Sequence, residues 1–466
     1  MPLPTIPSGN VASATAGGFE VANSCRFNYP DDPYMSRTPA GAGNQKTFTI
    51  SFWCKRGHLG SPGHQMLSYL QSGSTPRSEI FFNASDKLLC GINPSGSTWL
   101  ELTSTEVFRD VAAWYHICIA YDTTQGVEAN RVKLYINGVQ STWASGSYPT
   151  LNLDTGWNNT WIHTVGRYES GGSSEYDGYL AEVVMVDGSA LAPTSFGEFD
   201  EDSPTIWKPI NVSGLTFGTN GFYLDFEDSA NLGNDASGGT DFTEANLAAT
   251  DQATDTPTNN FCVMNPLDNY YFGGTFSEGN CQVVSSSSPD TYCTSTLGVS
   301  AGKWYMETEF DAGGATSNKL GIADKVSTST TLAAGDFTAS ASVRSNDGTG
   351  AIDGSGFTWT GWTTGDVISI ALDLTNNKFY MAKNGTWMNS ADPAAGSNGG
   401  TITAAASSTS GAYFFGFGDN HSSDTATYKF NFGGCSAFTV SSANSDGNGY
   451  GNFEYAVPSG YLAICT

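Results

Sequence analysis

The sequence is most strongly constrained by runs in which apolar and polar residues alternate. In TFTISFWCKR, residues 47–56, apolar side chains stand at every second position from Phe48 to Cys54. GKWYMETEF, residues 302–310, repeats the pattern. Successive side chains of a β-strand point to opposite faces of a sheet, so this period indicates strands with one buried face. Helical periodicity never extends beyond about two turns, so helices are not expected to build the core.

Short turn sequences separate these runs and predict hairpins. Asn137-Gly138 stands between VKLYI and VQS, and Asn376-Asn377 stands between ISIALDL and KFYMAK. Such pairs readily adopt the backbone conformation of tight hairpin turns. With 55 glycines and 39% hydrophobic residues, the chain can make many turns and still bury a core. We therefore predict an all-β protein with two antiparallel β-sandwich (jelly-roll) domains joined by a long polar connector.

The alternating runs fall into two groups, which set the expected domain boundaries. We expect an N-terminal segment at residues 1–17, a first sandwich at 18–195, a connector at 196–264 and a second sandwich at 265–466. The connector is too long for a simple hinge, and apart from one strand-like run, GFYLDFED, it is polar. It is either a free linker or a segment wrapped on one sandwich, and the wrapped alternative is slightly favoured.

Charge and cysteine content argue against several classes of partner. The net charge is −26 and no basic patch is present, so we expect no binding of nucleic acid and none of anionic lipid. No apolar run is long enough to span a membrane, and the opening MPLPTIPSGN lacks the features of a signal peptide, so no membrane insertion is expected. The nine cysteines lack C-x-x-C spacing. This favours buried thiols, made in a reducing cytoplasm, over a zinc site.

Both predicted sandwiches resemble known families. In the first, WYHI…YD…RVKLYINGV followed by YDGYLAEV resembles the laminin-G-like and concanavalin-A-like lectin/glucanase sandwich. This resemblance implies a jelly roll of two antiparallel sheets. In the second, GKWYMET, GDVISIALDL and FYMAKNG resemble a SPRY domain in residues and in order. That resemblance also implies a two-sheet sandwich.

Five further blocks extend the resemblance beyond the two domains. They are VANSCRFN, SRTPAGAGNQKTFT, FGEFDED…WKP, GNDASGG…DFT and DTPTNNFCVMNPL, and the ending VPSGYLAICT accompanies them. Together they resemble virion proteins of marine tailed bacteriophages, which chain lectin-like and SPRY-like sandwiches in this order. The resemblance implies a location in the virion after synthesis in the host cytoplasm. It also implies other virion proteins as partners, with the chain present in many copies or as a homo-oligomer.

The stretch SFGEFDEDSPTIWKP, residues 195–209, raises the question of catalysis. Glu198, Asp200 and Asp202 alternate, so a strand would place all three carboxylates on one face. Glycosidases of the lectin-like fold use Glu-x-Asp-x-Glu, whereas the third residue here is an Asp, one methylene (roughly 1.5 Å) shorter. The triplet also follows the last strand of its sandwich and runs into a Ser-Pro turn. We therefore expect a solvated exit turn, no catalytic residues and no enzymatic activity.

Glycan binding needs exposed aromatic rings and amides, and two loops offer them. The candidate binding residues are Trp157, Asn158, Asn159 and Trp161 in GWNNTWIH, and Trp359 and Trp362 in FTWTGWTTGD. An indole covers the C–H face of a sugar while neighbouring amides meet its hydroxyls. The competing interpretation is that these tryptophans pack in the core or at its rim.

A metal or cofactor is not indicated by any specific motif, so none is expected. Asp31-Asp32 and Asp122 could be calcium ligands at the rim of a lectin-like sandwich. However, no ordered D-x-D-x-D-G loop exists, so calcium stays open and no metal ligand is assigned.

Three functions remain from the sequence. The first is a non-enzymatic phage virion structural protein, a tail fibre, spike or capsid-surface decoration that recognises a host-surface glycan or protein. The second is a purely architectural cement or assembly-bridging protein. The third, a polysaccharide-degrading enzyme, is disfavoured by the acidic exit turn.

Overall fold

The structure is a computed structural model of the 466-residue chain. The residues it describes are 5–6, 18–29, 31–60, 64–70, 77–94, 99–168, 175–271, 273–286, 291–313, 318–324, 338–419 and 425–466. The expected N-terminal segment, residues 1–17, lies outside these ranges apart from 5–6.

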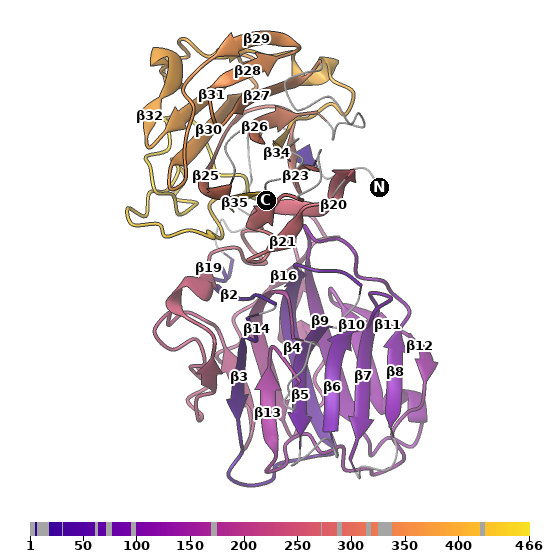
Figure 1. Ribbon diagram of the computed structural model, residues 1–466. Coiled ribbons are helices and arrows are strands. Elements are labelled where there is room, and N and C mark those ends of the chain that lie inside the picture. Colours follow the sequence, from indigo (N-terminus) through magenta and orange to yellow (C-terminus); the bar gives the residue numbers. More distant parts are fainter. Residues whose placement is uncertain are drawn as a thin grey trace. The chain divides into compact units, whose positions relative to one another are not determined.

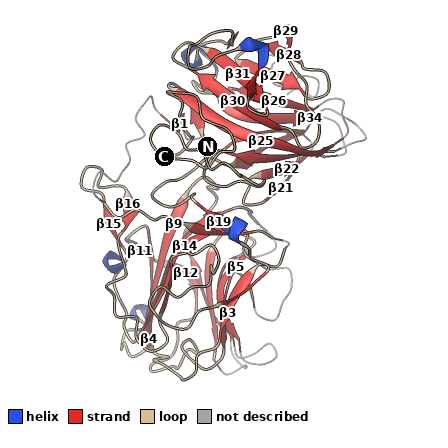
Figure 2. Cartoon of the chain, turned by 90° about the vertical axis from the view of Figure 1, so that its left-hand side faces the viewer, coloured by secondary structure: helices blue, strands red, loops and turns tan. Residues whose placement is uncertain are grey.

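The chain forms two units made almost wholly of antiparallel strands (Figure 1). The first unit spans residues 14–258, and the second comprises residues 1–13 and 259–466. Figure 2 shows that helical turns are confined to short segments. These are η1 (Glu128–Asn130), η2 (Pro193–Ser195), η3 (Ala249–Asp251), η4 (Met388–Ser390) and η5 (Ala405–Ser407). The predicted all-β fold of antiparallel sandwiches is confirmed. Within the described ranges, no helix has the length and hydropathy of a membrane span.

The first unit is a sandwich of two sheets, which we call sheet A and sheet B (Figure 1). Sheet A has the order β11 (Val139–Ser141), β10 (Val132–Ile136), β9 (Trp114–Asp122), β4 (Thr47–Arg56), β14 (Gly178–Asp187), β2 (Ser24–Phe27) and β19 (Gln252–Ala253), and β17 (Phe222–Leu224) also pairs with β14. Sheet B has the order β12 (Trp143–Gly146), β8 (Leu100–Ser104), β7 (Leu88–Asn93), β6 (Arg77–Phe82), β5 (His64–Leu70), β13 (Ile162–Val165), β3 (Tyr34–Arg37) and β18 (Thr243–Ala245).

The core of this unit lies between the two sheets and follows from the alternation in the sequence. Phe48, Ile50 and Phe52 of β4 are fully buried in one cluster with Ile80 and Phe82 of β6. The predicted strand at residues 47–56 is β4, and the Asn137-Gly138 turn joins β10 to β11 in a hairpin. One face of each sheet therefore points into a shared apolar core, as the period of two requires.

The outer face of sheet A is covered by residues 196–258, which the sequence placed in a connector. Phe196, Val212 and Tyr223 form a buried cluster on Cys118 and Val184 of the sheet. The short strands β17, β18 and β19 also join the sheets of the first unit, which ends at residue 258. These residues are an integral layer of the first unit rather than a free linker.

A hairpin in this layer is held by a buried histidine. The hairpin pairs β15 (Gly197–Phe199) with β16 (Trp207–Pro209). Trp207 Nε1 lies 3.0 Å from His116 Nδ1, and His116 Nε2 lies 2.8 Å from Ser51 Oγ. An indole N–H can only donate, so Nδ1 accepts and Nε2 carries the proton that it donates to Ser51. His116 is therefore neutral and fixed in one tautomer.

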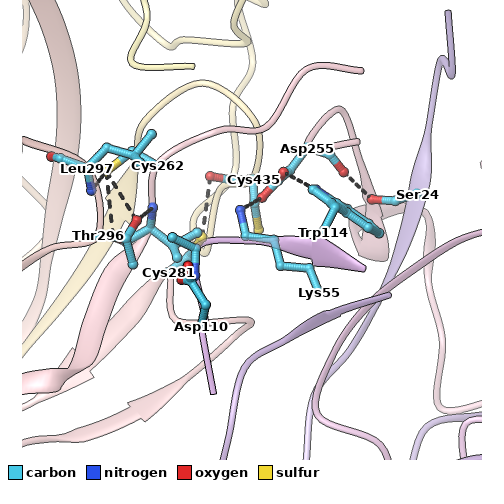
Figure 3. A network of polar contacts seen from close by, with 12 residues as sticks. Ser24, Lys55, Asp110, Trp114, Asp255, Cys262, Cys281, Thr296, Leu297 and Cys435 are labelled. Carbon is cyan, nitrogen blue, oxygen red and sulfur yellow. Dashed lines mark hydrogen bonds and ion pairs between the residues drawn. The ribbon is translucent and has the colours of Figure 1, made fainter. Parts of the chain in front are cut away.

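A buried ion pair fastens the end of the layer to sheet A (Figure 3). Lys55 Nζ lies 2.6 Å from Asp255 Oδ2, and the two side chains are 1% and 0% exposed. Trp114 Nε1 donates to the other carboxylate oxygen at 3.0 Å, and Ser24 Oγ donates to the Asp255 carbonyl at 2.6 Å. A charge removed from water in this way is tolerated only when it is paired and hydrogen-bonded.

A second buried ion pair holds the middle of the layer. Arg37 Nη1 lies 2.9 Å from Asp235 Oδ2, and Arg37 Nη2 donates to the Asn220 carbonyl at 2.6 Å. The same guanidinium lies 5.0 Å from the ring centroid of Phe222 and 4.7 Å from that of Phe242. One arginine thus organises three parts of a segment that is otherwise polar.

The second unit is also a two-sheet sandwich, made of sheet C and sheet D. Sheet C has the order β20 (Met264–Tyr271), β23 (Thr291–Ser295), β34 (Phe414–Asp419), β26 (Asn318–Ala323), β27 (Ser340–Arg344), β28 (Thr349–Ile352) and β29 (Ser355–Thr358). Sheet D has the order β21 (Thr275–Ser277), β22 (Gln282–Val284), β35 (Ala426–Asn431), β25 (Lys303–Gly313), β30 (Val367–Asp373), β31 (Lys378–Lys383) and β32 (Thr386–Trp387), and β33 (Gly400–Thr401) pairs with β31. A short parallel pair, β1 (Thr5–Ile6) with β24 (Gly298–Val299), completes the unit.

Sheet D is buried on both faces, although its sequence alternates. Trp304 of β25 is 1% exposed, but its neighbours Tyr305 and Glu307 are also fully buried. Tyr305 packs in a cluster with Phe453 and Tyr461 of the C-terminal segment. Glu307 accepts hydrogen bonds from the backbone of the same segment. The end of the chain therefore covers this sheet, much as residues 196–258 cover sheet A.

The buried Lys55–Asp255 pair predicts a large effect of a single substitution. Asp255→Ala should lower the free energy of unfolding of the first unit by about 3–5 kcal/mol, because it removes the carboxylate that a buried ammonium contacts. Chemical denaturation followed by tryptophan fluorescence measures this change. The control is Asp154→Ala, which breaks the exposed Lys46–Asp154 pair and should cost about 1 kcal/mol or less. Equal effects of the two substitutions would contradict the anchoring role.

Three buried histidines predict an acid-sensitive first unit. Burial lowers the pKa of His64 and His116 to about 3, and that of His163 to about 4. The unfolded chain takes up these protons near pH 6.5, so stability should fall as the pH drops from about 6.5 toward 4. His116→Gln should flatten this decline by up to about 2–3 kcal/mol at pH 4.5, whatever its cost at pH 7. The test is to measure the free energy of unfolding of both proteins at pH 7 and at pH 4.5. If the loss of stability between these pH values is the same in the variant, unfolding does not add a proton to His116.

Candidate functional site

The outer face of sheet B carries a row of small and polar residues that runs from β18 to β8. Successive cross-strand partners in this row are Thr243, Ser36, Thr164, Ser68, Glu79, Gly91 and Glu101. Each alternates along its strand with core residues, such as Ile80 beside Glu79. The row therefore faces away from the core.

An arginine held between two aromatic rings lies on this face where β5, β6 and β7 reach one end of the sheet. The Arg77 guanidinium lies 5.0 Å from the ring centroid of Trp99 and 5.1 Å from that of Tyr168. Arg77 Nη1 also donates to the Tyr168 hydroxyl at 3.2 Å. Its Nε lies 2.6 Å from Glu79 Oε1, a close ion pair without the alignment of a hydrogen bond. The Arg77 guanidinium thus contacts two aromatic residues, Trp99 and Tyr168, that come from two other segments of the chain. We call Arg77, Trp99 and Tyr168 the aromatic clamp.

Trp99 lies directly on the sheet because residue 91 has no side chain. A Cβ at Gly91 would stand 2.0 Å from the Trp99 ring, so only glycine leaves room for the indole. Trp99 Nε1 donates to Glu101 Oε2 at 3.0 Å, which fixes the ring in place. The side chain is half-buried, so part of its surface is available to a ligand.

Glu79 lies at the base of the clamp in a nearly dry environment. It is 5% exposed and accepts a hydrogen bond from Gln65 Nε2 at 2.7 Å. Burial raises the pKa of this carboxyl, while Gln65 and Arg77 oppose the shift. Gln65 Oε1 and Asn93 Oδ1 on the same face are buried acceptors that no donor of the described residues reaches. The floor of the site is therefore rich in hydrogen-bond acceptors.

A second arginine–aromatic pair lies at the other end of the face. Arg167 stacks on Tyr34 at 3.4 Å from the ring centroid, and its Nη1 donates to both oxygens of Asp32 at 2.7 Å. Two arginines of a strongly acidic chain thus lie on one face of sheet B, each paired with a carboxylate.

The structure places three of the six sequence-predicted binding residues in the interior, which corrects the expectation of exposed loops. Trp157 is 2% exposed and packs edge-on against Tyr69 at 5.0 Å. Asn158 is 0% exposed, and its Nδ2 donates to a backbone carbonyl. Trp362 is 2% exposed and donates from Nε1 to the Tyr428 hydroxyl at 2.9 Å. These side chains close gaps in the two cores and present no face to a sugar.

The other three candidates keep some exposed surface but do not form one site. The ring centroids of Trp161 and Tyr69 lie 5.4 Å apart. Asn159 Nδ2 donates a hydrogen bond to Gln45 Oε1. Trp359 stacks on Phe379 in the second unit at 5.8 Å. Their role in binding stays a prediction.

The acidic stretch at residues 195–209 forms a turn rather than a site. Asp200 Oδ1 accepts the backbone N–H groups of Asp202 and Ser203 at 3.0 and 2.8 Å, as in a tight turn. Lys208 lies 3.5 Å from Glu198 and 3.4 Å from Asp200. These carboxylates are occupied by their own hairpin, which agrees with the expected exit turn.

The calcium candidates have protein partners. Asp32 pairs with Arg167, and Asp122 accepts hydrogen bonds from Thr124 and Gln125. In the part of the chain that is described, no three His, Cys, Asp or Glu residues gather as a metal site would need. Calcium binding stays an untested prediction.

The aromatic clamp was missed because its members are distant in the sequence. No local signal marked Arg77 and Glu79 as facing away from the core, because RSEIFF, residues 77–82, reads as three polar residues followed by three apolar ones rather than as an alternation. The position of Trp99 over Gly91 depends on strand register, which the sequence does not reveal.

The first sandwich matches a known family over most of its length. Residues 32–194 match the Concanavalin A-like lectin/glucanases superfamily, Laminin_G_3. Sheet B and the aromatic clamp lie largely within this range. No curated protein matches the chain.

Solved structures similar to this chain include several β-sandwich proteins. The SPRY domain of human HERC1 is 13% identical with a TM-score of 0.29, over 38% of this chain and 99% of that one. A heptameric SAP-like pentraxin from Limulus polyphemus is 16% identical with a TM-score of 0.29, over 38% and 80%. A putative carbohydrate binding protein from Bacteroides ovatus is 15% identical with a TM-score of 0.33, over 48% and 58%.

Proposed function

We propose that the first sandwich binds an uncharged, hydroxyl-rich glycan on the outer face of sheet B. The observation that carries this proposal is the aromatic clamp of Arg77, Trp99 and Tyr168. A half-exposed indole offers a flat apolar surface to the C–H face of a sugar, and the guanidinium and phenol beside it offer groups for its hydroxyls. The match of residues 32–194 to a lectin superfamily supports a binding role for this sandwich.

The charges around the clamp favour a neutral ligand. The Arg77 guanidinium is already paired with Glu79, and a second carboxylate, that of Glu101, accepts a hydrogen bond from Trp99. The chain as a whole carries a net charge of −26. A uronate or sulfated sugar would be repelled by this field, whereas hydroxyl groups can donate to the carboxylates.

The same geometry favours binding over hydrolysis. Glycoside hydrolysis needs two carboxylates on either side of a sugar bond. Glu79 and Glu101 are separated by Gly91, but the Trp99 ring fills the space above that glycine. Glu79 is engaged by Arg77 and Gln65, and Glu101 by Trp99. We therefore propose a non-enzymatic binding protein.

The biological setting follows from the sequence resemblance and stays a prediction. We propose that the chain is a virion component displayed in many copies, so that weak single sites add up to firm attachment to a host-surface glycan. In this setting the neighbouring virion proteins are its partners. A purely architectural role is the alternative if no glycan binds.

Substitution of the clamp tests the binding proposal. Trp99→Ala should weaken binding to neutral glycans by about tenfold or more, because it removes the stacking surface. Gly91→Ala should also weaken binding, because the added methyl group displaces the Trp99 ring although the tryptophan itself is retained. A glycan array that carries neutral, carboxylated and sulfated sugars, read with multimerised protein, is the measurement.

A tryptophan of the second unit supplies the matched control. Trp359→Ala should leave binding unchanged, since Trp359 packs against Phe379 in the second unit. Loss of binding in Trp359→Ala but not in Trp99→Ala would move the site to the second unit. Binding by no multimer would favour the architectural role.

A further inference from the structure

Two cysteines of the second unit lie at the same end of β22 and β35, which are neighbouring strands of sheet D. Cys281 directly precedes β22, and its carbonyl accepts the Phe430 N–H of β35 at 2.6 Å. Cys435 follows β35, where Asn431 forms an antiparallel bridge with Ser436. Asn431 is paired with β25 on its other side, so Ser436 lies on the side of β22. The turn after β35 therefore brings Cys435 to the end of β22, beside Cys281.

The sulfur atom of each cysteine contacts the backbone next to the other. Cys281 Sγ lies 3.7 Å from the carbonyl oxygen of Cys435 (Figure 3). Cys435 Sγ lies 4.0 Å from the carbonyl oxygen of Glu278, which also accepts the Cys281 N–H at 3.0 Å. Both sulfur atoms thus point into one small region. A disulfide needs two cysteines whose side chains converge in this way from neighbouring backbone segments.

The two thiols differ in access to solvent. Cys435 is 9% exposed and Cys281 is 1% exposed. A small oxidant therefore reaches Cys435 first, and Cys281 lies behind it. By contrast, Cys293 is 1% exposed in the middle of sheet C, and its sulfur faces the Phe417 carbonyl.

We propose that Cys281 and Cys435 form a disulfide when the protein meets a low-molecular-weight disulfide such as glutathione disulfide. The Cys435 thiolate attacks one sulfur of the oxidant and releases one glutathione thiolate. The Cys281 thiolate then attacks Cys435 Sγ in the mixed disulfide and releases the second glutathione. The two protein thiols are oxidised by two electrons, one disulfide is reduced to two thiols, and the two thiol protons pass to the leaving thiolates.

The bond would lock an edge of the second unit after the chain leaves a reducing compartment. It ties the start of β22 to the segment that follows β35, and that segment leads into the C-terminal layer over sheet D. Cross-linking positions 154 residues apart in the chain strongly restricts the unfolded state. We therefore expect the oxidised second unit to melt about 5–10 °C higher than the reduced one.

Mass spectrometry of the full chain tests this inference. Native protein is incubated with glutathione disulfide or with dithiothreitol, denatured, alkylated and digested. After glutathione disulfide, the expected result is the loss of two alkylation sites and a peptide that links Cys281 to Cys435. Cys435→Ser should abolish the cross-link and the rise in melting temperature, whereas Cys293→Ala, the buried control, should keep both.

Three outcomes would overturn the inference. They are full alkylation of all nine cysteines after the oxidant, a stable glutathione adduct on Cys435 without consumption of Cys281, and a cross-link that joins another pair. None of them depends on glycan binding, so this test stands apart from the proposed function.

Discussion

The buried contact between Lys55 and Asp255 decides which surface of the first unit is left for function. It fastens the last part of residues 196–258 to sheet A, and the Arg37–Asp235 pair and the Trp207–His116 hydrogen bond hold the rest. Once this layer is in place, sheet A is covered on both faces. The outer face of sheet B carries the aromatic clamp, at the end of β6 and β7. Ion pairs this deep contribute little net stability, but breaking one is costly, so they act mainly to specify where the layer lies.

In both units a later segment of the chain covers the outer face of one sheet. Each is a sandwich in which the chain that follows the last long strand returns to cover one sheet, as residues 196–258 do on sheet A and the C-terminal segment does on sheet D. Covering one sheet buries backbone and aromatic surface that would otherwise be exposed. In the first unit the opposite sheet is lined by paired charges and half-buried aromatic rings, which suits weak and reversible contact with a sugar.

The sequence predicted those features that are local and missed those that depend on long-range packing. Strand β4 and the β30–β31 hairpin were predicted because their signals, alternation and turn residues, lie within a few neighbouring positions of the sequence. The sequence left Trp157 open between an exposed loop position and packing in the core, because its burial depends on Tyr69, far away in the chain. For residues 196–258 the sequence left a free linker and a wrapped segment both open, because β17 and β18 are only three residues long and show no clear period. The aromatic clamp joins three distant segments, and nothing short of the sheet register could have assembled it.

The proposed glycan site lies on the outer face of sheet B, around the aromatic clamp. Hydrogen–deuterium exchange of the full chain with and without a neutral oligosaccharide chosen from the array tests it most directly. With the oligosaccharide bound, exchange should slow in β6, β7 and the segment around Trp99, with no change in residues 195–209 or in the second unit. Protection confined to the second unit or to the 195–209 hairpin would contradict this site.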